Sequence, residues 1–265
     1  MLTYDEWDRR LEQIGTDTWW MPERVHRESR EDIFYTADPN GDARYSIVWR
    51  ISNQKNTYEE LIKEVIEAHQ HTEDSTFIVT AVSYSESLVQ ELNAHGYVKK
   101  TTADAWTISV ETPRPQIPQD LIIKRVEDLQ SLKDMDYIMK ACFPNFKLRD
   151  EDTLQQDLEA TVGPKARCRR FIAYDLASQE PLASGALNLY PDLKLGFLWG
   201  GCTIPSARGR GVYSALVTKR MKEAHELNFK RIGIHALRGT SGPIIEKQGF
   251  VKHGPVDQWQ KKFSV

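Results

Sequence analysis

Two similar segments, 153 residues apart, constrain the fold of this chain more than any other feature. AHGYVKK (94–100) resembles KQGFVKH (247–253), and a stretch of strand-forming residues with a tryptophan follows each of them. The same spacing, without a gap, relates three pairs of residues: Gly96 and Gly249, Trp106 and Trp259, and Ile51 and Ile204. Internal similarity at a constant spacing indicates repeated structural units. The sequence therefore predicts two similar domains in tandem.

A proline-rich segment lies between the two copies. TPRPQIPQD (112–120) contains three prolines and little apolar material, which is typical of a linker. A chain of 265 residues is long enough for two domains that each have a core. We therefore expect a first domain at 1–112, a linker at 113–119 and a second domain at 120–265.

The overall composition excludes several classes of function. The formal net charge is −3 and the pI is about 6.2, so the chain lacks the basic character of a nucleic-acid-binding protein. No apolar run approaches the roughly 18 residues that span a bilayer, and the charged start MLTYDEWDRRLEQ does not resemble a signal peptide. The three cysteines are not spaced as metal ligands. We therefore expect a cytoplasmic protein without a metal, a membrane partner or a nucleic-acid partner.

The second half alternates between strand-like and helix-like segments. Strands are expected where β-forming residues lie between turn residues: 121–126, 169–176, 181–190, 194–204, 231–237 and 250–263. Helices are expected at 128–143, 150–162, 212–227 and 242–249. Strands interrupted by helices in this way predict an α/β (α+β) fold, with a mixed sheet and helices on both faces.

One connection has the character of an anion-binding site. In IPSARGRGVYSALV (204–217) two glycines and two arginines stand between a predicted strand and a predicted helix. The first backbone N–H groups of a helix have no partner within the helix, and the helix dipole favours negative charge there. Gly209 and Gly211 can adopt the unusual dihedral angles that point successive N–H groups at one ligand. With Arg208 and Arg210 beside them, these groups suit a diphosphate.

The loop lacks the motifs of P-loop nucleotidases and of dinucleotide-binding folds. R-G-R-G-V-Y (208–213) resembles the coenzyme A pyrophosphate loop of the GNAT acetyltransferase superfamily, R/Q-x-x-G-x-G/A, and differs only at its last position. The preceding TIP and the later GF (249–250) are also common in that family. The resemblance covers about 120–265. The first half resembles a degenerate GNAT domain, with KNTY (55–58) in place of the glycine loop.

The resemblance implies a largely antiparallel sheet and acetyl-CoA as co-substrate, with the acetyl group passing directly to a primary amine in a ternary complex. The amine belongs to a small molecule or a peptide. The doubled glycine at 200–201 predicts a β-bulge next to the site. The residues implied to contact acetyl-CoA are Cys202, Thr203, Ile204, Arg208, Gly209, Arg210, Gly211, Val212, Tyr213 and Ser214.

The catalytic groups follow the family pattern less closely. Many GNAT enzymes protonate the leaving thiolate with a tyrosine four residues before the GF glycine, but Ile245 stands there. Tyr213 is the candidate acid, and packing of the first helical turn is its alternative role. His235 is the candidate base, because strand alternation places it opposite the apolar face, and a purely structural histidine is the alternative.

The acceptor is expected to contact the loop at 142–152, where Phe143 and Phe146 are candidates; packing under the loop would explain both equally well. No carboxylate occurs in the strand at 194–204 to serve as a base. With Ile245, this leaves a second hypothesis, a non-catalytic acyl-CoA-binding or regulatory module. A monomer is favoured over a homodimer, because two domains in one chain can mimic the dimer of single-domain GNAT proteins.

Overall fold

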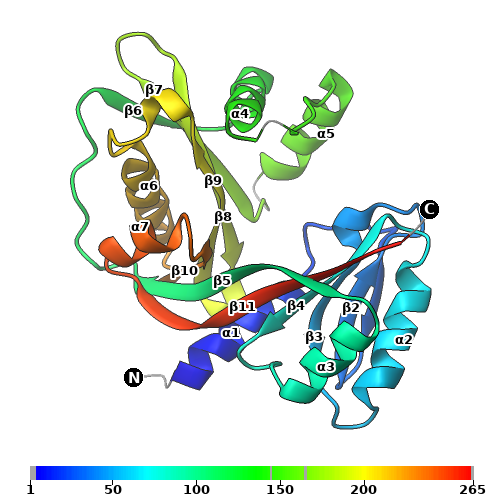
Figure 1. Cartoon of the computed structure of the whole chain (residues 1–265). Coiled ribbons are helices and arrows are strands. Elements are labelled where there is room, and N and C mark those ends of the chain that lie inside the picture. Colours follow the sequence, from blue (N-terminus) through cyan, green and yellow to red (C-terminus); the bar gives the residue numbers. More distant parts are fainter. Residues whose placement is uncertain (1–3, 144, 164–165, 264–265) are drawn as a thin grey trace. The chain divides into compact units, whose positions relative to one another are not determined.

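The computed structural model describes residues 4–143, 145–163 and 166–263 (Figure 1). The chain divides into two compact units. Unit 1 comprises Met1–Trp106 and His235–Val265, and unit 2 comprises Thr107–Ile234.

Unit 1 is a sheet with helices packed against it. Its strands lie side by side in the order β1 (His26–Ser29), β2 (Ile33–Ala37), β3 (Ile47–Ile51), β4 (Asp74–Thr80), β11 (Val251–Lys262) and β5 (Val98–Ser109). β3 and β4 are parallel, whereas β1–β2, β2–β3 and β4–β11 are antiparallel. Its helices are α1 (Tyr4–Thr16), α2 (Tyr58–His69), α3 (Glu86–Ala94) and α7 (Gly242–Lys247), with a 3₁₀ turn at Ala43–Tyr45.

Unit 2 contains the second sheet segment. Its strands lie in the order β10 (Arg231–Leu237), β9 (Leu195–Thr203), β8 (Pro181–Tyr190), β7 (Cys168–Asp175) and β6 (Leu121–Arg125). β9 and β10 are parallel, and the other pairs are antiparallel. Its helices are α4 (Leu129–Cys142), α5 (Glu151–Thr161) and α6 (Val212–Glu226), with 3₁₀ turns at Pro191–Leu193 and Pro205–Ala207. α4 and α6 pack on opposite faces of these strands (Figure 1).

These elements confirm the predicted fold class, a mixed and largely antiparallel sheet flanked by helices. The strands predicted at 181–190 and 231–237 have the observed bounds. Local chemistry explains where helices begin: Asp128 accepts a hydrogen bond from the amide of Ser131 in a capping box, and Asp150 accepts one from the amide of Thr153.

The repeat is visible in the structure. β5 and β11 are 153 residues apart at both ends. Gly96 and Gly249 follow α3 and α7 with the same positive φ of 81°, which favours glycine. Trp106 and Trp259 are both buried. Each repeat also contains one parallel pair, β3–β4 or β9–β10. The predicted tandem of two similar folds is confirmed.

The compact units do not follow the sequence repeat at the C-terminus. β11 belongs to the second repeat, but it pairs with β4, and Trp259 opposite Phe77 joins the core of unit 1. Residues 113–118 contain neither helix nor strand, as a linker would. The boundaries 1–112, 113–119 and 120–265 describe the repeat rather than the packing, and they remain a prediction.

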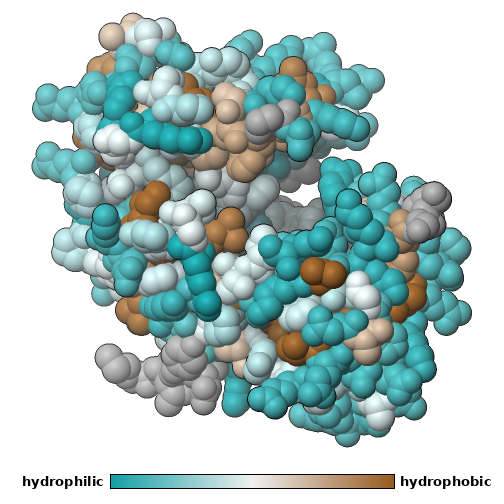
Figure 2. Space-filling model, in the orientation of Figure 1, coloured by the Kyte–Doolittle hydropathy of each residue, from teal (hydrophilic) through white to brown (hydrophobic). Residues whose placement is uncertain are grey.

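The surface has the usual character of a folded protein. On the face in Figure 2 hydrophilic residues predominate, and hydrophobic residues form small separate areas. Exposed large apolar side chains lie on different elements, for example Val98 on β5 and Leu148 between α4 and α5. Scattered exposure of this kind is ordinary.

Candidate active site

The predicted anion-binding loop connects β9 to α6. Gly209 and Gly211 have positive φ values of 80° and 76°, and no atom lies within 4 Å of a Cβ built on either of them. Gly211 is the N-cap of α6 and has no side chain that could cap the helix. Within the described part of the chain, the amides at 209–213 donate no hydrogen bond. They form a cluster of donors at the positive end of a helix, of which residues 209–211 are exposed, and this arrangement fits a pyrophosphate.

The two arginines of the loop differ in their surroundings. The Nη2 of Arg210 lies 3.1 Å from the Asp120 carboxylate and 2.9 Å from the Asp175 carboxylate. Its hydrogen bond to Asp175, and then the one to Asp120, raises the pKa of Arg210. Arg208 is exposed, and its Nε donates to the carbonyl of Thr203 at 3.3 Å. Since no described carboxylate contacts Arg208, its charge is the one available to an anion.

β9 has the predicted bulge. Ser184 pairs with Cys202 and Ala186 with Trp199, so Gly200 and Gly201 both lie opposite Gly185. The parallel pairing with β10 ends at Leu198 and Ile234. From residue 199 to 203, the edge of β9 that faces away from β8 therefore has no paired strand in unit 2, and it can bind an extended ligand through backbone groups.

The three predicted contact residues at the end of β9 have different roles in the ladder. The amide of Ile204 donates to the carbonyl of Leu182 at 2.9 Å, so it is engaged by β8. Backbone groups alternate in direction along an antiparallel strand, and Thr203 therefore points its N–H and C=O away from β8. The Cys202 thiol is buried, 3.5 Å from the Ser184 hydroxyl and 3.7 Å from the Met139 sulfur. Of the three residues, Thr203 offers the backbone that a ligand can reach.

Tyr213 explains how the loop accommodates its departure from the family pattern. The phenol ring lies on Gly201, and a Cβ at Gly201 would be only 2.8 Å from Cε2 of Tyr213. A glycine in β9 thus makes room for a large residue where the family has a small one. In the sequence this accommodation is visible only as the doubled glycine at 200–201, from which a bulge is predicted but not the contact with Tyr213. Val212 is buried and Ser214 is partly buried beside Tyr213 in the first turn of α6.

Trp199, next to the bulge, was missed by the sequence interpretation. Its side chain is 40% exposed, and its Nε1 donates to Oδ1 of Asn188 at 2.7 Å. The sequence feature that could have indicated Trp199 is its place directly before the doubled glycine. The indole presents a fixed apolar surface at the point where β9 leaves β10.

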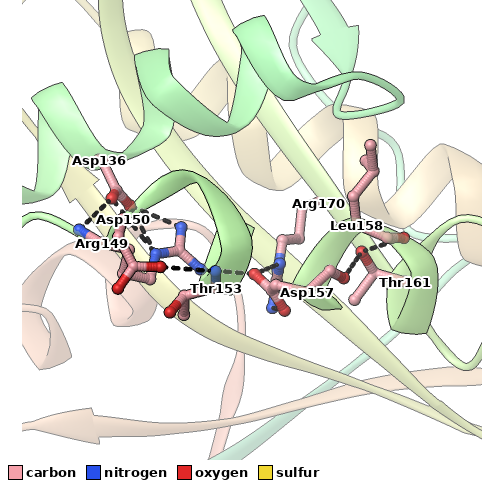
Figure 3. A network of polar contacts seen from close by, with 8 residues as sticks. All are labelled: Asp136, Arg149, Asp150, Thr153, Asp157, Leu158, Thr161 and Arg170. Carbon is pink, nitrogen blue, oxygen red and sulfur yellow. Dashed lines mark hydrogen bonds and ion pairs between the residues drawn. The ribbon is translucent and has the colours of Figure 1, made fainter. Parts of the chain in front are cut away.

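The loop between α4 and α5 is held by a network of charges (Figure 3). Arg149 donates to Asp136 through Nε at 3.0 Å and Nη2 at 2.6 Å, and to Asp157 through Nη1. Arg170 on β7 also binds Asp157. Burial raises the pKa of Asp157, but the hydrogen bonds from the two arginines outweigh it, so that the pKa is lowered.

The predicted acceptor residues lie at the start of this loop. Phe143 is 49% exposed and Phe146 is partly buried, and the amide of Phe146 donates to the carbonyl of Phe143 at 2.8 Å. The structure therefore leaves Phe143 accessible to a ligand. The network around Arg149 holds the other end of the same loop.

The candidate base, His235, belongs by packing to unit 1, whereas the glycine loop belongs to unit 2. Burial lowers the pKa of His235 to about 4, so its imidazole is neutral at pH 7. Ile234 and Ala236, its neighbours along β10, are buried, as the alternation predicted. Ile245, at the family's tyrosine position, is fully buried. The role of His235 as a base remains a prediction.

Among the described residues of unit 1, no loop corresponds to the glycine loop before α6. The N-terminus of α2 is closed by a capping box in which the Glu60 carboxylate accepts from the amide of Thr57 at 2.9 Å. Pairing of β3 with β4 ends at Val48 and Phe77, and α1 packs against β3 where the Trp49 ring lies against Gly15. The Thr80 hydroxyl at the end of β4 donates to Glu12 of α1 at 2.6 Å. The N-terminus of α2 and the end of β4 are thus bonded to the chain's own side chains.

Two further observations concern function classes. None of the helices described between residues 4 and 263 has the length and apolarity that a bilayer span requires. In the same part of the chain, His, Cys, Asp and Glu side chains do not gather in groups of three or more that could hold a metal ion.

Comparisons with known proteins agree with this geometry. Residues 132–250 match the acetyltransferase (GNAT) family, while no curated protein sequence matches the chain. Similar solved structures include a functionally unknown conserved protein from Staphylococcus epidermidis (TM-score 0.66, 14% identity, covering 95% of this chain and 100% of that one). A GCN5-related N-acetyltransferase from Sphaerobacter thermophilus has a TM-score of 0.63 at 15% identity, covering 89% of this chain and 82% of that one.

A tandem GNAT protein from the clavulanic acid biosynthesis pathway also has a TM-score of 0.63, at 11% identity, and the match covers 99% of this chain and 95% of that one. At such identities the likeness shows the fold, and it extends over both repeats. Residues 132–250 therefore match the GNAT acetyltransferase family, and the chain has the fold of the tandem GNAT proteins.

Proposed function

We propose that the chain is an acetyl-CoA-dependent N-acetyltransferase. It moves the acetyl group directly to a primary amine of a small molecule or a peptide in a ternary complex. The observation that carries the proposal is the cluster of unbonded amides at 209–213, at the N-terminus of α6, within the family-matched segment. The proposal includes a monomeric, cytoplasmic protein with domains at 1–112 and 120–265.

In this proposal the pyrophosphate binds the amides at 209–213, and Arg208 adds a positive charge. The pantetheine arm lies along the free edge of β9 and bonds to the backbone of Thr203. Arg210 contributes indirectly, since its bonds to Asp120 and Asp175 tie the loop to β6 and β7.

Tyr213 is the proposed acid for the leaving thiolate, because its phenol borders the free edge of β9 at Gly201. His235 is the proposed base: burial keeps its imidazole in the neutral form that accepts a proton. Phe143 and Phe146 are the proposed acceptor contacts.

Thiol release from acetyl-CoA, measured over polyamines, amino acids, aminoglycosides and N-terminal peptides, tests the reaction. Binding is tested by thermal stabilisation. At a hundredfold excess over Kd, acetyl-CoA should stabilise the chain by about 2.7 kcal/mol. Arg208→Glu should remove this stabilisation, and Lys222→Glu, on the exposed surface of α6, is the matched control. An unchanged shift in Arg208→Glu contradicts the loop assignment.

The second candidate is a non-catalytic acyl-CoA-binding or regulatory module. It is favoured by Ile245, which is buried where many family members have a tyrosine, and by the lack of carboxylates in β9. It predicts that acetyl-CoA stabilises the chain and that no amine in the panel releases thiol. Turnover with any acceptor excludes it.

A further inference from the structure

Arg220, in α6, is a fully buried arginine without an acidic partner. Its Nε donates to the carbonyl of Leu216 at 3.1 Å, and Nη1 donates to the carbonyl of Ala186 at 3.0 Å. Among the described residues, Nη2 has no hydrogen-bond partner, and the other two hydrogen bonds of the guanidinium go to backbone carbonyls rather than to a carboxylate. Arginine is rarely buried unless it is paired, because the desolvation of the charge is not compensated. Packing alone does not account for such a residue.

Two glycines make room for Arg220 and Tyr213. A Cβ at Gly185 would lie 2.7 Å from Nη1 of Arg220, and a Cβ at Gly201 would lie 2.8 Å from the Tyr213 ring. The register of β8 and β9 places Gly185 directly opposite the bulge that contains Gly201. The two side chains of α6 therefore lie on adjacent glycines of one sheet surface.

Tyr213 and Arg220 are seven residues apart, which is about two turns, so they project from the same side of α6. Burial lowers the pKa of Arg220, and the phenol of Tyr213 is close enough to oppose that effect. A phenolate next to the guanidinium would supply the negative charge that the buried cation lacks.

We propose that Arg220 is a positioning residue that acts through Tyr213: its guanidinium holds the phenol over Gly201 and stabilises the phenolate left when Tyr213 donates its proton. This inference rests on the proposed acetyl transfer. In that step the amine nitrogen bonds to the acetyl carbon, the carbon–sulfur bond breaks, and the sulfur takes the phenolic proton. The proton lost by the amine passes to His235, the proposed base, and from there through water to Tyr213, so protons and charges balance.

A double-mutant cycle tests the proposal. Arg220→Met and Tyr213→Phe should each lower kcat roughly 10- to 100-fold, and the double variant should be no slower than Tyr213→Phe alone. KM for acetyl-CoA should change less than threefold. Arg220→Lys, which keeps a cation, should recover part of kcat. Lys222→Met, the same substitution on the exposed surface of α6, is the matched control and should behave as wild type.

Methionine in place of a buried, unpaired arginine removes a charge from the core, so the variant is expected to fold. Gly185→Ala provides a second route, since its methyl group displaces the guanidinium and leaves the charge present. It should lower kcat in the wild type and have little effect in Tyr213→Phe. If Arg220→Met does not fold, this cycle decides the question.

Independent, multiplicative losses in either cycle, or a wild-type kcat in Arg220→Met, overturn the inference. A wild-type kcat in Tyr213→Phe overturns it as well, since Arg220 then has no acid to act through. These outcomes leave the acetyltransferase proposal standing. If the wild type neither binds acetyl-CoA nor releases thiol, the proposed function itself fails.

Discussion

Asp136→Ala tests whether the charge network holds the acceptor loop. The side chain of Asp136 is 4% exposed, and that of Arg149 is 22% exposed. Asp136 accepts from the Nε, Nη2 and backbone N–H of Arg149, at 3.0, 2.6 and 3.1 Å. Alanine removes these acceptors and leaves Arg149 with Asp157 alone.

The expected cost follows from this geometry. Removing one partner of a buried ion pair costs roughly 3–5 kcal/mol, and we expect about 3 kcal/mol because Arg149 keeps Asp157 and part of its hydration. For a chain of this size that loss lowers Tm by roughly 6–12 °C. Acceptor KM should rise, because the loop with Phe143 and Phe146 loses its anchor, while acetyl-CoA binding should be retained.

Glu151→Ala is the matched control. Glu151 forms an ion pair with Lys133 at 3.0 Å, which joins α4 to the first residue of α5, two residues beyond Arg149, but both side chains are well exposed. An exposed pair contributes roughly 0–1 kcal/mol. Thermal unfolding of both variants, with acceptor kinetics, provides the comparison. Equal shifts in Tm, or an unchanged acceptor KM in Asp136→Ala, would refute the reasoning.

Four further predictions concern the two units. Gly201→Ala should destabilise the chain by about 1–3 kcal/mol, because the added methyl group overpacks against Tyr213. Tyr213→Ser in the same chain should relieve most of that cost, as measured by thermal unfolding. If the stability losses of the two single variants simply add in the double variant, the contact is disproved. Because the N-terminus of α2 is capped by its own side chains, calorimetry should give one acetyl-CoA per chain, and two would contradict this interpretation. Gly211→Ala should lose about 1–2 kcal/mol of stability from its positive φ and should also bind acetyl-CoA more weakly; thermal unfolding with and without acetyl-CoA checks both, and an unchanged Tm in either condition would contradict the prediction. Burial lowers the folded-state pKa of His69 and of His235 to about 4, below the ordinary value near 6.5. The free energy of unfolding should therefore fall as the pH drops from about 6.5 to about 4. His69→Gln and His235→Gln should each remove up to roughly 3 kcal/mol of that pH dependence, as measured by denaturation at several pH values.

Much of the fold could be predicted from the sequence because it depends on local rules. Strand and helix bounds follow from periodicity, capping residues and turn residues, as at Asp128 and Asp150. The bulge followed from two adjacent glycines, and the tandem repeat from one constant spacing. The positive φ of Gly209 and Gly211 followed from the need of the loop for residues without a side chain.

The tertiary structure decided which residues meet. Arg210 was expected at the phosphate, but it is paired with Asp120 and Asp175, which are 90 and 35 residues away in the chain. Ile204 was expected to bind pantetheine, but its amide is bonded to β8. The final strand pairs with β4 rather than remaining with the rest of the second repeat, and no local pattern encodes that choice.

The sequence by itself thus determined much of the local backbone conformation, the repeat and the position of the glycine loop. Only the tertiary structure placed Tyr213 on Gly201, Arg220 on Gly185 and Arg149 between Asp136 and Asp157. The physical reason is that local conformation depends on a residue and its neighbours in the chain, whereas ion pairing and close packing depend on distances between segments that only the folded chain brings together.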